Sequence, residues 1–308
     1  MHQELLASKH ILVVGDSMLD RYWFGDAHRI SPEAPVPIVR IQRCDERLGG
    51  AANVALNIRS LGIRASLMTV IGNDEPGHIL ADLLEKAGIG TMLHVDASLS
   101  TTVKLRIVAR QQQMLRADFE NHPNNEVLAA LLGDYETTIA SVDAVILSDY
   151  GKGGLDHIKQ MISEARRHRK PVLIDPKGDD YERYRGATVI TPNRAELALV
   201  VGNWKNEEEL RIKAQNLRAH LELDALLLTR SEEGMTLYTA DGELTVPAQA
   251  REVFDVSGAG DTVIAVMASM LAAGLSIQQA VHIANRAGGI VVGKLGTASV
   301  SYAELFGE

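Results

Sequence analysis

Residues 255–261 read Asp255-Val256-Ser257-Gly258-Ala259-Gly260-Asp261, and an apolar run from Thr262 to Leu275 follows them directly. A glycine-rich turn that opens an apolar run is typical of a loop leading into a buried helix. Bare backbone amides at such a turn, together with the positive end of the helix dipole, bind anions such as a phosphoryl group. The stretch therefore predicts an anion site at the amides of Gly258, Ala259 and Gly260.

Asp261 falls in the first turn of the predicted helix, beside the expected anion. A carboxylate there repels a phosphoryl group, so its presence favours a chemical task, and taking a proton from an attacking hydroxyl is the obvious one. The alternative is an ordinary helix start, in which Ser257 caps the helix and Asp261 complements the dipole. A short glycine motif does not decide between the two.

The composition is that of a soluble globular protein, with 46% hydrophobic and 23% charged residues among 308. The net charge of −9 disfavours a nucleic-acid partner, which would require a basic surface. Cys44 is the only cysteine, as suits a reducing cytoplasm. The first ten residues lack the apolar core of a signal peptide, and the run from Val263 to Leu275 is too short to span a bilayer. We therefore expect a cytoplasmic protein with no membrane partner.

Short apolar runs alternate with helical segments along most of the chain. The expected strands are residues 11–15, 65–71, 144–147, 172–174, 188–190 and 225–228, and the expected helices include 48–61, 75–87 and 155–168. Apolar runs this short are typical of strands buried on both faces of a parallel sheet. The alternation predicts an α/β fold with a mostly parallel central sheet flanked by helices.

Polar residues stand just past the carboxyl ends of the expected strands. They are Asp16, Asp149, Asp175, Asn193 and Thr229. One such residue alone would be an ordinary cap or turn former. Because ligands bind at this edge of open α/β sheets, five of them together favour a ligand site.

Two segments, at about 17–44 and 98–120, break the alternation of strands and helices. Both carry alternating apolar residues without a helical period, which predicts strands of a small extra sheet. Such a sheet would form a lid over the ligand edge, and its free apolar face predicts a homodimer through the lid. Lys104 and Arg106 are two residues apart and so share a face, where they would offer cations to a negatively charged ligand.

Four stretches resemble signatures of the ribokinase-like (PfkB) sugar kinases, and they occur in the order found in that family. Residues 255–261 resemble the second signature and Gly49-Gly50-Ala51-Ala52-Asn53-Val54-Ala55 the first. Residues 191–196 match the Asn-x-x-Glu element, and residues 228–234 match the strand and loop on the nucleotide side. The match extends over nearly the whole chain, so it implies one ribokinase-like kinase domain over residues 1–308. Val256 departs from the pattern, because most of the family has threonine there, and any role of that hydroxyl is in doubt.

Further stretches resemble one subgroup of the family, the D-glycero-β-D-manno-heptose-7-phosphate kinases. They are residues 15–23, 29–37, 148–153, 175–178 and 293–297. The resemblance implies phosphorylation of the anomeric hydroxyl of the heptose 7-phosphate by ATP, to give the 1,7-bisphosphate for ADP-heptose and lipopolysaccharide synthesis. In many relatives a nucleotidyltransferase domain is fused to the kinase. Because this chain ends at Glu308, we expect a stand-alone kinase or a fragment of such a fusion.

Other functions remain as alternatives to this one. The nearest is a different PfkB-type sugar or sugar-phosphate kinase, and the next is a sugar- or nucleotide-binding protein without turnover. A dinucleotide-dependent oxidoreductase is disfavoured, because Gly15-Asp16-Ser17-Met18 stands where that fold has its glycine fingerprint.

The resemblance also implies roles for individual residues and two cofactors, ATP and Mg²⁺, with K⁺ as a third in some members. Asp261 is the expected base, and Gly258, Ala259 and Gly260 form the anion hole. On the nucleotide side it implies Asn193, Arg194, Ala195, Lys177, Thr229, Ser231, Gly234 and Asn285, with Glu196 reaching Mg²⁺ through water. On the sugar side it implies Asp16, Asp20, Gly49, Gly50, Asn53, Lys104, Arg106, Asp149 and Lys152. A monovalent cation would lie on the Asp255 carboxylate and the backbone oxygens of Val256, Val291 and Gly296.

Overall fold

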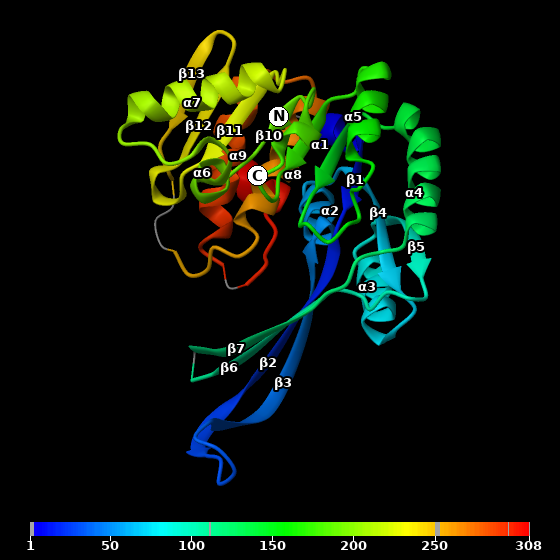
Figure 1. Cartoon of the computed structure of the whole chain (residues 1–308), viewed down its shortest axis with the longest axis vertical. Helices are drawn as coiled ribbons and strands as arrows, with labels where there is room; N and C mark the ends of the chain where they lie inside the picture. The colour runs from blue at the N-terminus through cyan, green and yellow to red at the C-terminus, as the bar shows by residue number, and fades with distance from the viewer. Residues whose placement is uncertain (1–2, 111, 250–252, 295, 308) are drawn as a thin grey trace.

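The computed structural model describes residues 3–110, 112–249, 253–294 and 296–307, which form a layered α/β body and a projecting second sheet (Figure 1). The strands are β1 (His10–Gly15), β2 (Ser17–Ile30), β3 (Pro37–Gly50), β4 (Arg64–Gly72), β5 (Gly90–Asp96), β6 (Val103–Ala109), β7 (Gln112–Phe119), β8 (Ala144–Ser148), β9 (Val172–Asp175), β10 (Val189–Ile190), β11 (Ala225–Thr229), β12 (Met235–Thr239) and β13 (Gly242–Val246). The helices are α1 (Gln3–Ala7), α2 (Ala51–Ser60), α3 (Glu75–Lys86), α4 (Asn125–Thr138), α5 (Ile158–Arg167), α6 (Arg194–Val201), α7 (Glu207–His220), α8 (Ala259–Ala272), α9 (Ile277–Val291) and α10 (Tyr302–Phe306).

Within the described residues, nine strands form the main sheet in the order β13-β12-β11-β10-β9-β8-β1-β4-β5. The strands from β11 to β5 are parallel to their neighbours, whereas β12 and β13 pair antiparallel at one edge. The prediction of a mostly parallel sheet flanked by helices is confirmed. All the parallel strands end on the same side of the sheet, so the polar residues that follow them are brought to one edge.

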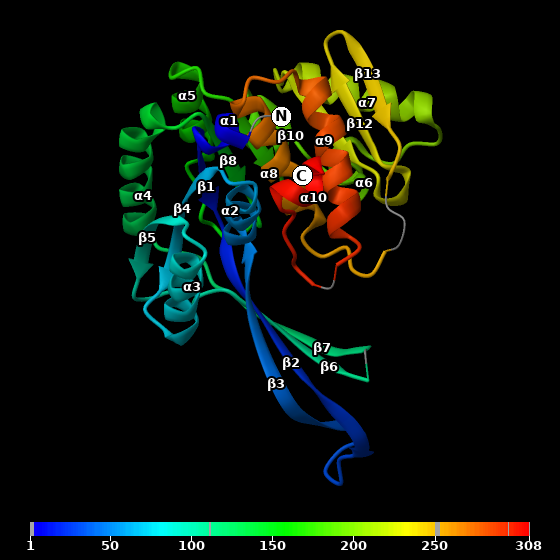
Figure 2. The ribbon, with the colours of Figure 1, turned by 180° about the vertical axis from the view of Figure 1, so that it is seen from behind.

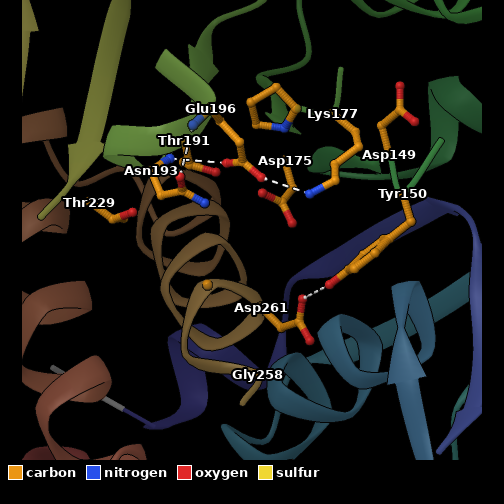
Figure 3. A pocket seen from close by; sticks show the side chains of 12 residues that line it. Asp149, Tyr150, Asp175, Lys177, Thr191, Asn193, Glu196, Thr229, Gly258 and Asp261 are labelled. Atoms are coloured by element: carbon orange, nitrogen blue, oxygen red, sulfur yellow. Dashed lines mark hydrogen bonds and ion pairs between the residues drawn. The ribbon is translucent and has the colours of Figure 1, made fainter. Parts of the chain in front are cut away.

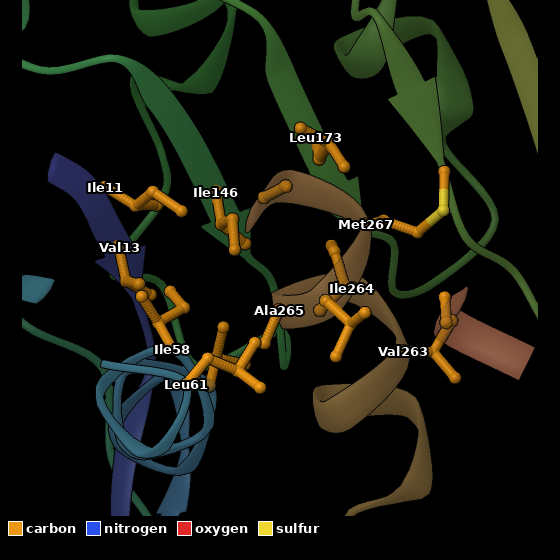
Figure 4. Packing of buried hydrophobic residues seen from close by; sticks show 14 of the residues in the cluster. Ile11, Val13, Ile58, Leu61, Ile146, Leu173, Val263, Ile264, Ala265 and Met267 are labelled. Atoms are coloured by element: carbon orange, nitrogen blue, oxygen red, sulfur yellow. The ribbon is translucent and has the colours of Figure 1, made fainter. Parts of the chain in front are cut away.

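The inner strands of the main sheet, such as β1, β8, β9 and β11, are buried on both faces, which explains why they are continuous apolar runs. In β1, Ile11 and Val13 belong to the core shared with α2, α8 and α9, and Leu12 and Val14 belong to the core shared with α4, α5 and α7. Figure 4 shows the first core, in which α2 and α8 lie side by side and both pack against the sheet. Every residue of α8 from Asp261 to Met270 is buried. A helix enclosed on all sides is a rigid support for the residues of its first turn.

The second sheet has the order β3-β2-β6-β7 and extends away from the body as a lid (Figures 1 and 2). The predicted lid is confirmed, but its first segment runs to Gly50 rather than to residue 44. Leu48–Gly50, expected to open a helix, instead end β3, and α2 begins at Ala51. The physical reason lies at Gly50, which pairs with Ser17 and has a φ of 59°. A Cβ on Gly50 would meet the Asp16 carbonyl oxygen at 2.4 Å, so only glycine allows this close passage.

One predicted helix start was wrong by about one turn. The helix expected from Leu155 begins at Ile158, because the preceding residues form turns around Asp16. Asp261 lies in the first turn of α8, as predicted, and this helix begins at Ala259, within the glycine-rich stretch.

Candidate active site

The N-terminus of α8 is not covered by a side chain. Its N-cap is Gly258, with a φ of 78°, and none of the described side chains makes a capping hydrogen bond there. Ser257 is therefore not the cap that the ordinary-helix alternative required. Gly258 and Gly260 both line a cavity, and a Cβ on Gly260 would meet nothing within 4 Å. Gly258 and Gly260 of the predicted anion site thus face the cavity, whereas the Ala259 amide donates to the Val256 carbonyl at 3.2 Å.

This cavity has a volume of about 180 Å³ and lies at the carboxyl edge of the main sheet (Figure 3). It is lined by Asp149, Tyr150, Asp175, Pro176, Lys177, Thr191, Asn193, Glu196, Thr229, Gly258, Gly260 and Asp261. Four of the five polar strand-end residues are in this set, and Asp16 is not. The expectation that polar strand ends converge is therefore met at β8, β9, β10 and β11.

Asp261 is 4% exposed, and both of its carboxylate oxygens accept a hydrogen bond. The Tyr150 hydroxyl donates to Oδ1 at 2.7 Å, and the Asn53 side-chain amide donates to Oδ2 at 2.7 Å. Burial raises the pKa of Asp261 to about 6, although both donors and the nearby Lys104 oppose the rise. The carboxylate is consequently ionised for the most part at neutral pH, as a proton acceptor must be.

Asn193 and Glu196 form a capping box at the start of α6. The Asn193 side chain accepts from the Glu196 amide at 2.9 Å, and the Glu196 carboxylate accepts from the Asn193 amide at 3.1 Å. The other Glu196 oxygen binds the Lys177 ammonium at 3.1 Å. Nearby, burial and the charges of Asp261 and Glu196 raise the pKa of Asp175 well above its usual range, against the effect of Lys177. The cavity therefore holds more negative charge than its lysine balances.

The other residues predicted for the nucleotide side do not line the cavity. Ala195 is exposed in the first turn of α6, and Arg194 pairs with Glu233. Gly234 has a φ of 96° and passes close to the segment 246–248, where a Cβ on it would meet the Val246 carbonyl oxygen. Asn285 contacts the same segment, because its side-chain amide donates to the Pro247 carbonyl at 2.8 Å. Ser231 begins the 3-10 turn that precedes Gly234. The structure thus ties Arg194 to Glu233, and Gly234 and Asn285 to the segment 246–248, but none of these residues lines the cavity.

Several sugar-side residues meet on the opposite side of Asp261. Gly49 is packed against the Asp20 carboxylate, whose Oδ1 accepts from Arg106 at 2.6 Å. Lys104 lies on the same face of β6 as Arg106, with its ammonium 5.3 Å from the centre of the Tyr150 ring. Through Tyr150, the cluster connects the lid strands β2, β3 and β6 to Asp261.

Three predicted sugar-side residues are held by partners within the chain. Asp16 accepts three backbone N–H groups, those of Tyr150, Lys152 and Gly154, at 2.9–3.0 Å. Asp149 accepts from the Tyr184 hydroxyl at 2.8 Å and from the Gly151 amide at 2.8 Å. The Lys152 ammonium pairs with Glu120.

The expected monovalent-cation residues are only partly gathered. The Asp255 carboxylate accepts from the Gly296 amide at 3.0 Å and from the Ser257 amide at 2.9 Å. The carbonyl oxygens of Val256 and Val291 accept from backbone N–H groups of the following turns. Leu295, in the last of the heptose-kinase-like stretches, lies outside the described residues.

Tyr150 lies in residues 148–153, one of the stretches that resemble the heptose-7-phosphate kinases, but the sequence predicts no role for it. The sequence signal for such a role is weak, because an aromatic residue after a strand end is common and only the fold brings the Tyr150 hydroxyl to Asp261.

Among the described residues, no helix is long and apolar enough to cross a membrane, and no group of three or more His, Cys, Asp or Glu side chains is arranged to hold a metal ion.

Comparison with known proteins gives a consistent result. The model of the pfkB family carbohydrate kinases matches residues 8–303. The chain is 55% identical, over 305 residues, to a D-beta-D-heptose 7-phosphate kinase of Bordetella bronchiseptica, and the match covers 99% of this chain and 97% of that protein. It is 54% identical, over 296 residues, to a bifunctional protein HldE of Haemophilus influenzae, a match that covers 96% of this chain and 62% of that protein.

A solved structure shares the fold. Phosphofructokinase-2 from Escherichia coli, in complex with substrates and products, superposes with a TM-score of 0.82 at 20% sequence identity, and the match covers 97% of each chain. At this identity the likeness concerns the fold alone.

Proposed function

The chain belongs to the pfkB family of carbohydrate kinases, and we propose that it transfers the γ-phosphoryl group of ATP to the anomeric hydroxyl of D-glycero-β-D-manno-heptose 7-phosphate. The product would be the 1,7-bisphosphate, a precursor of ADP-heptose, and the reaction would take place in the cytoplasm. The observation that carries the chemistry is the ionised Asp261 carboxylate at the uncapped N-terminus of α8. The identity to the heptose 7-phosphate kinase supports the substrate.

In this proposal, the sugar hydroxyl attacks the γ-phosphorus in line while Asp261 accepts its proton. The new O–P bond forms as the bond to the β-phosphate oxygen breaks, and ADP leaves. The backbone amides at Gly258, Ala259 and Gly260 stabilise the charge on the transferred group. Lys177, which lines the same cavity, adds a positive charge on the nucleotide side.

The residues of the nucleotide side fit a Mg²⁺ ion. Asp175 and Glu196 line one cavity with Lys177 as its only lysine or arginine among the described lining residues, so a divalent cation would balance their charge. Mg²⁺ is usually held by one or two carboxylates, waters and the substrate's phosphates, which agrees with the absence of a larger ligand cluster in the described residues. We assign it to Asp175 and Glu196, with Asn193 beside them. When bound, the ion would neutralise charge on the phosphate oxygens. A monovalent cation such as K⁺ is proposed near Asp255 and Gly296.

The test of this function is an assay of ADP release with ATP and a panel of sugar phosphates, with phosphorus NMR to locate the new phosphate. We expect turnover with the heptose 7-phosphate and a new signal from an anomeric phosphate. Turnover with another sugar phosphate in preference would favour a different kinase of the family. Binding of the sugar phosphate without ADP release would favour a non-catalytic protein.

The outer face of the lid is proposed to bind a second copy of the chain. Ile107 and Leu115 are cross-strand partners, and Trp23 pairs with Ile107 on the neighbouring strand, so the three share a face opposite to that of Lys104 and Arg106. Leu115 is 55% exposed, which is unusual for a sheet residue in a monomer. An apolar sheet face that projects from the body in this way is completed by the same face of another molecule.

We expect sedimentation at micromolar concentration to show a dimer, and Leu115→Glu to shift it to a monomer. The matched control is Leu199→Glu on α6, since Leu199 is 68% exposed and lies away from the lid. A wild-type protein that sediments as a monomer at this concentration, with full activity, would refute the lid dimer.

A further inference from the structure

The loop that follows β8 is wrapped around a buried carboxylate. Asp16 is 6% exposed, and its Oδ2 accepts from the amides of Tyr150 at 3.0 Å and Lys152 at 2.9 Å, while its Oδ1 accepts from Gly154 at 2.9 Å. Hydrogen bonds to a buried charged group are among the stronger ones in proteins. They fix the backbone at Tyr150, so the direction of its side chain is set by the fold and not by a free loop.

From this fixed backbone, the Tyr150 side chain reaches Asp261 (Figure 3). The ring passes close to Gly50, where a Cβ would lie 3.5 Å from Cε2, and below the Lys104 ammonium. The hydroxyl then donates to Asp261 Oδ1 at 2.7 Å. Residues from the β8 loop, the lid and α8 thus meet at one tyrosine.

We propose that Tyr150 is a positioning residue for the catalytic base, which holds the Asp261 carboxylate in one orientation and in its ionised form. Tyr150 and Asn53 donate to different oxygens, and two such bonds fix both the plane and the rotation of the carboxylate. Each carboxylate oxygen can accept a second hydrogen bond, so an acceptor position remains for the sugar hydroxyl. This inference rests on the proposed function of Asp261.

The charges around Asp261 explain why such a donor is needed. Burial raises its pKa, and the charge of Asp20 on β2 acts in the same direction. Lys104 of β6 and the hydrogen bonds from Asn53 and Tyr150 lower it. The pKa of Tyr150 itself is raised well above its usual range by burial and by Asp261, so its hydroxyl keeps its proton and donates. Without that donor, Asp261 would hold its own proton to a higher pH.

A different role for Tyr150 is possible from the same contacts: the side chain could occupy the sugar's place only until the substrate displaces it. The two roles predict opposite effects of removing the hydroxyl. A positioning residue stays bonded to Asp261 during turnover, so its loss weakens the base. A placeholder leaves before the reaction, so its loss leaves the base unchanged or makes it more accessible.

The experiment compares Tyr150→Phe with the wild-type protein in the pH dependence of kcat. The base must be ionised, so the wild-type rate should fall as the pH drops through about 6. We expect this acid limb to move up by about one pH unit in Tyr150→Phe, the size of one hydrogen bond to a carboxylate. At pH values below the acid limbs of both proteins, the kcat of Tyr150→Phe should then be about tenfold lower than that of wild type. The KM for ATP should stay unchanged.

The control is Tyr135→Phe, which also removes a buried hydroxyl, one that donates to the Met161 carbonyl at 2.8 Å on the opposite face of the sheet. It should lower stability and leave the acid limb in place. An unmoved limb, or a higher kcat, in Tyr150→Phe would overturn the proposal.

A carbon-13 NMR titration of the Asp261 carboxyl group, assigned with Asp261→Asn and made without substrate, separates this inference from the proposed function. The Asp261 pKa should rise in Tyr150→Phe even if the protein turns over a different sugar. An unchanged Asp261 pKa refutes the positioning role whatever the substrate is.

Discussion

Asp261→Asn should lower kcat by about 10²–10⁴-fold, the range expected for the loss of a general base. Asparagine keeps the shape of the side chain, but its single oxygen can replace only one of the two carboxylate acceptors used by Asn53 and Tyr150, and it cannot accept a proton from the attacking hydroxyl. Affinity for ATP should hold or rise, because a negative charge beside the phosphates has been removed. Steady-state kinetics with both substrates would measure the two effects separately.

The same substitution should make the protein more stable at pH 7. The folded-state pKa of Asp261 is about 6, above the ordinary value of an aspartate, so the folded protein binds this proton more tightly than the unfolded chain does. The contribution of Asp261 to stability is therefore fully present below about pH 4 and is lost as the pH rises through about 6. Asparagine avoids this loss, which is on the order of 1–3 kcal/mol at pH 7.

Thermal unfolding of Asp261→Asn and wild type at pH 7 and at pH 4 tests this stability effect, and the difference should shrink at the lower pH. Near-normal turnover in a correctly folded Asp261→Asn protein would exclude Asp261 as the base. If Asp261→Asn is less stable than wild type at pH 7, the ionised Asp261 carboxylate does not lower the free energy of unfolding.

The main sheet could be predicted from the sequence because its physical cause is local. Strands buried on both faces must be apolar throughout, so residues 11–15 and 144–147 are visible as runs without reference to the rest of the chain. The start of α5 could not be predicted in this way. Leu155 is apolar and buried, yet it lies in a turn, because the preceding backbone is drawn to Asp16.

In the candidate site, too, some residues could be predicted from the sequence and others could not. Residues at strand ends were predictable, because the parallel sheet itself brings Asp149, Asn193 and Thr229 to one edge. Partners that depend on tertiary packing were not. The contact of Tyr150 with Asp261 joins residues 111 positions apart. The pairing of Lys152 with Glu120 likewise has no signature in the sequence.

Arg106→Ala should raise the KM for the sugar phosphate about 5- to 150-fold and leave the KM for ATP unchanged. A sugar that already carries a phosphate needs a second anion site, because the amides at the α8 N-terminus are taken by the γ-phosphoryl group. Lys104 and Arg106 share the face of β6 that meets Asp20 and Tyr150. Charge-assisted hydrogen bonds to a partly exposed phosphate contribute about 1–3 kcal/mol, which corresponds to this range of KM.

The Asp20 carboxylate makes the choice of variants important. Arg106→Ala leaves Asp20, 3% exposed, without its ion-pair partner, so the variant also loses stability. Arg106→Lys keeps a positive charge beside Asp20 but lacks the planar fork that binds a phosphate through two hydrogen bonds, so its KM should still rise. Arg43 on β3 is also a lid cation, and its guanidinium lies over the ring of Phe24 on β2. Arg43→Ala should change neither the KM for the sugar phosphate nor the KM for ATP. The decisive comparison is the same heptose without its phosphate, because loss of a phosphate contact raises the KM of the phosphorylated sugar more than that of the sugar without phosphate. If both sugars suffer equally in Arg106→Ala, the phosphate is bound elsewhere.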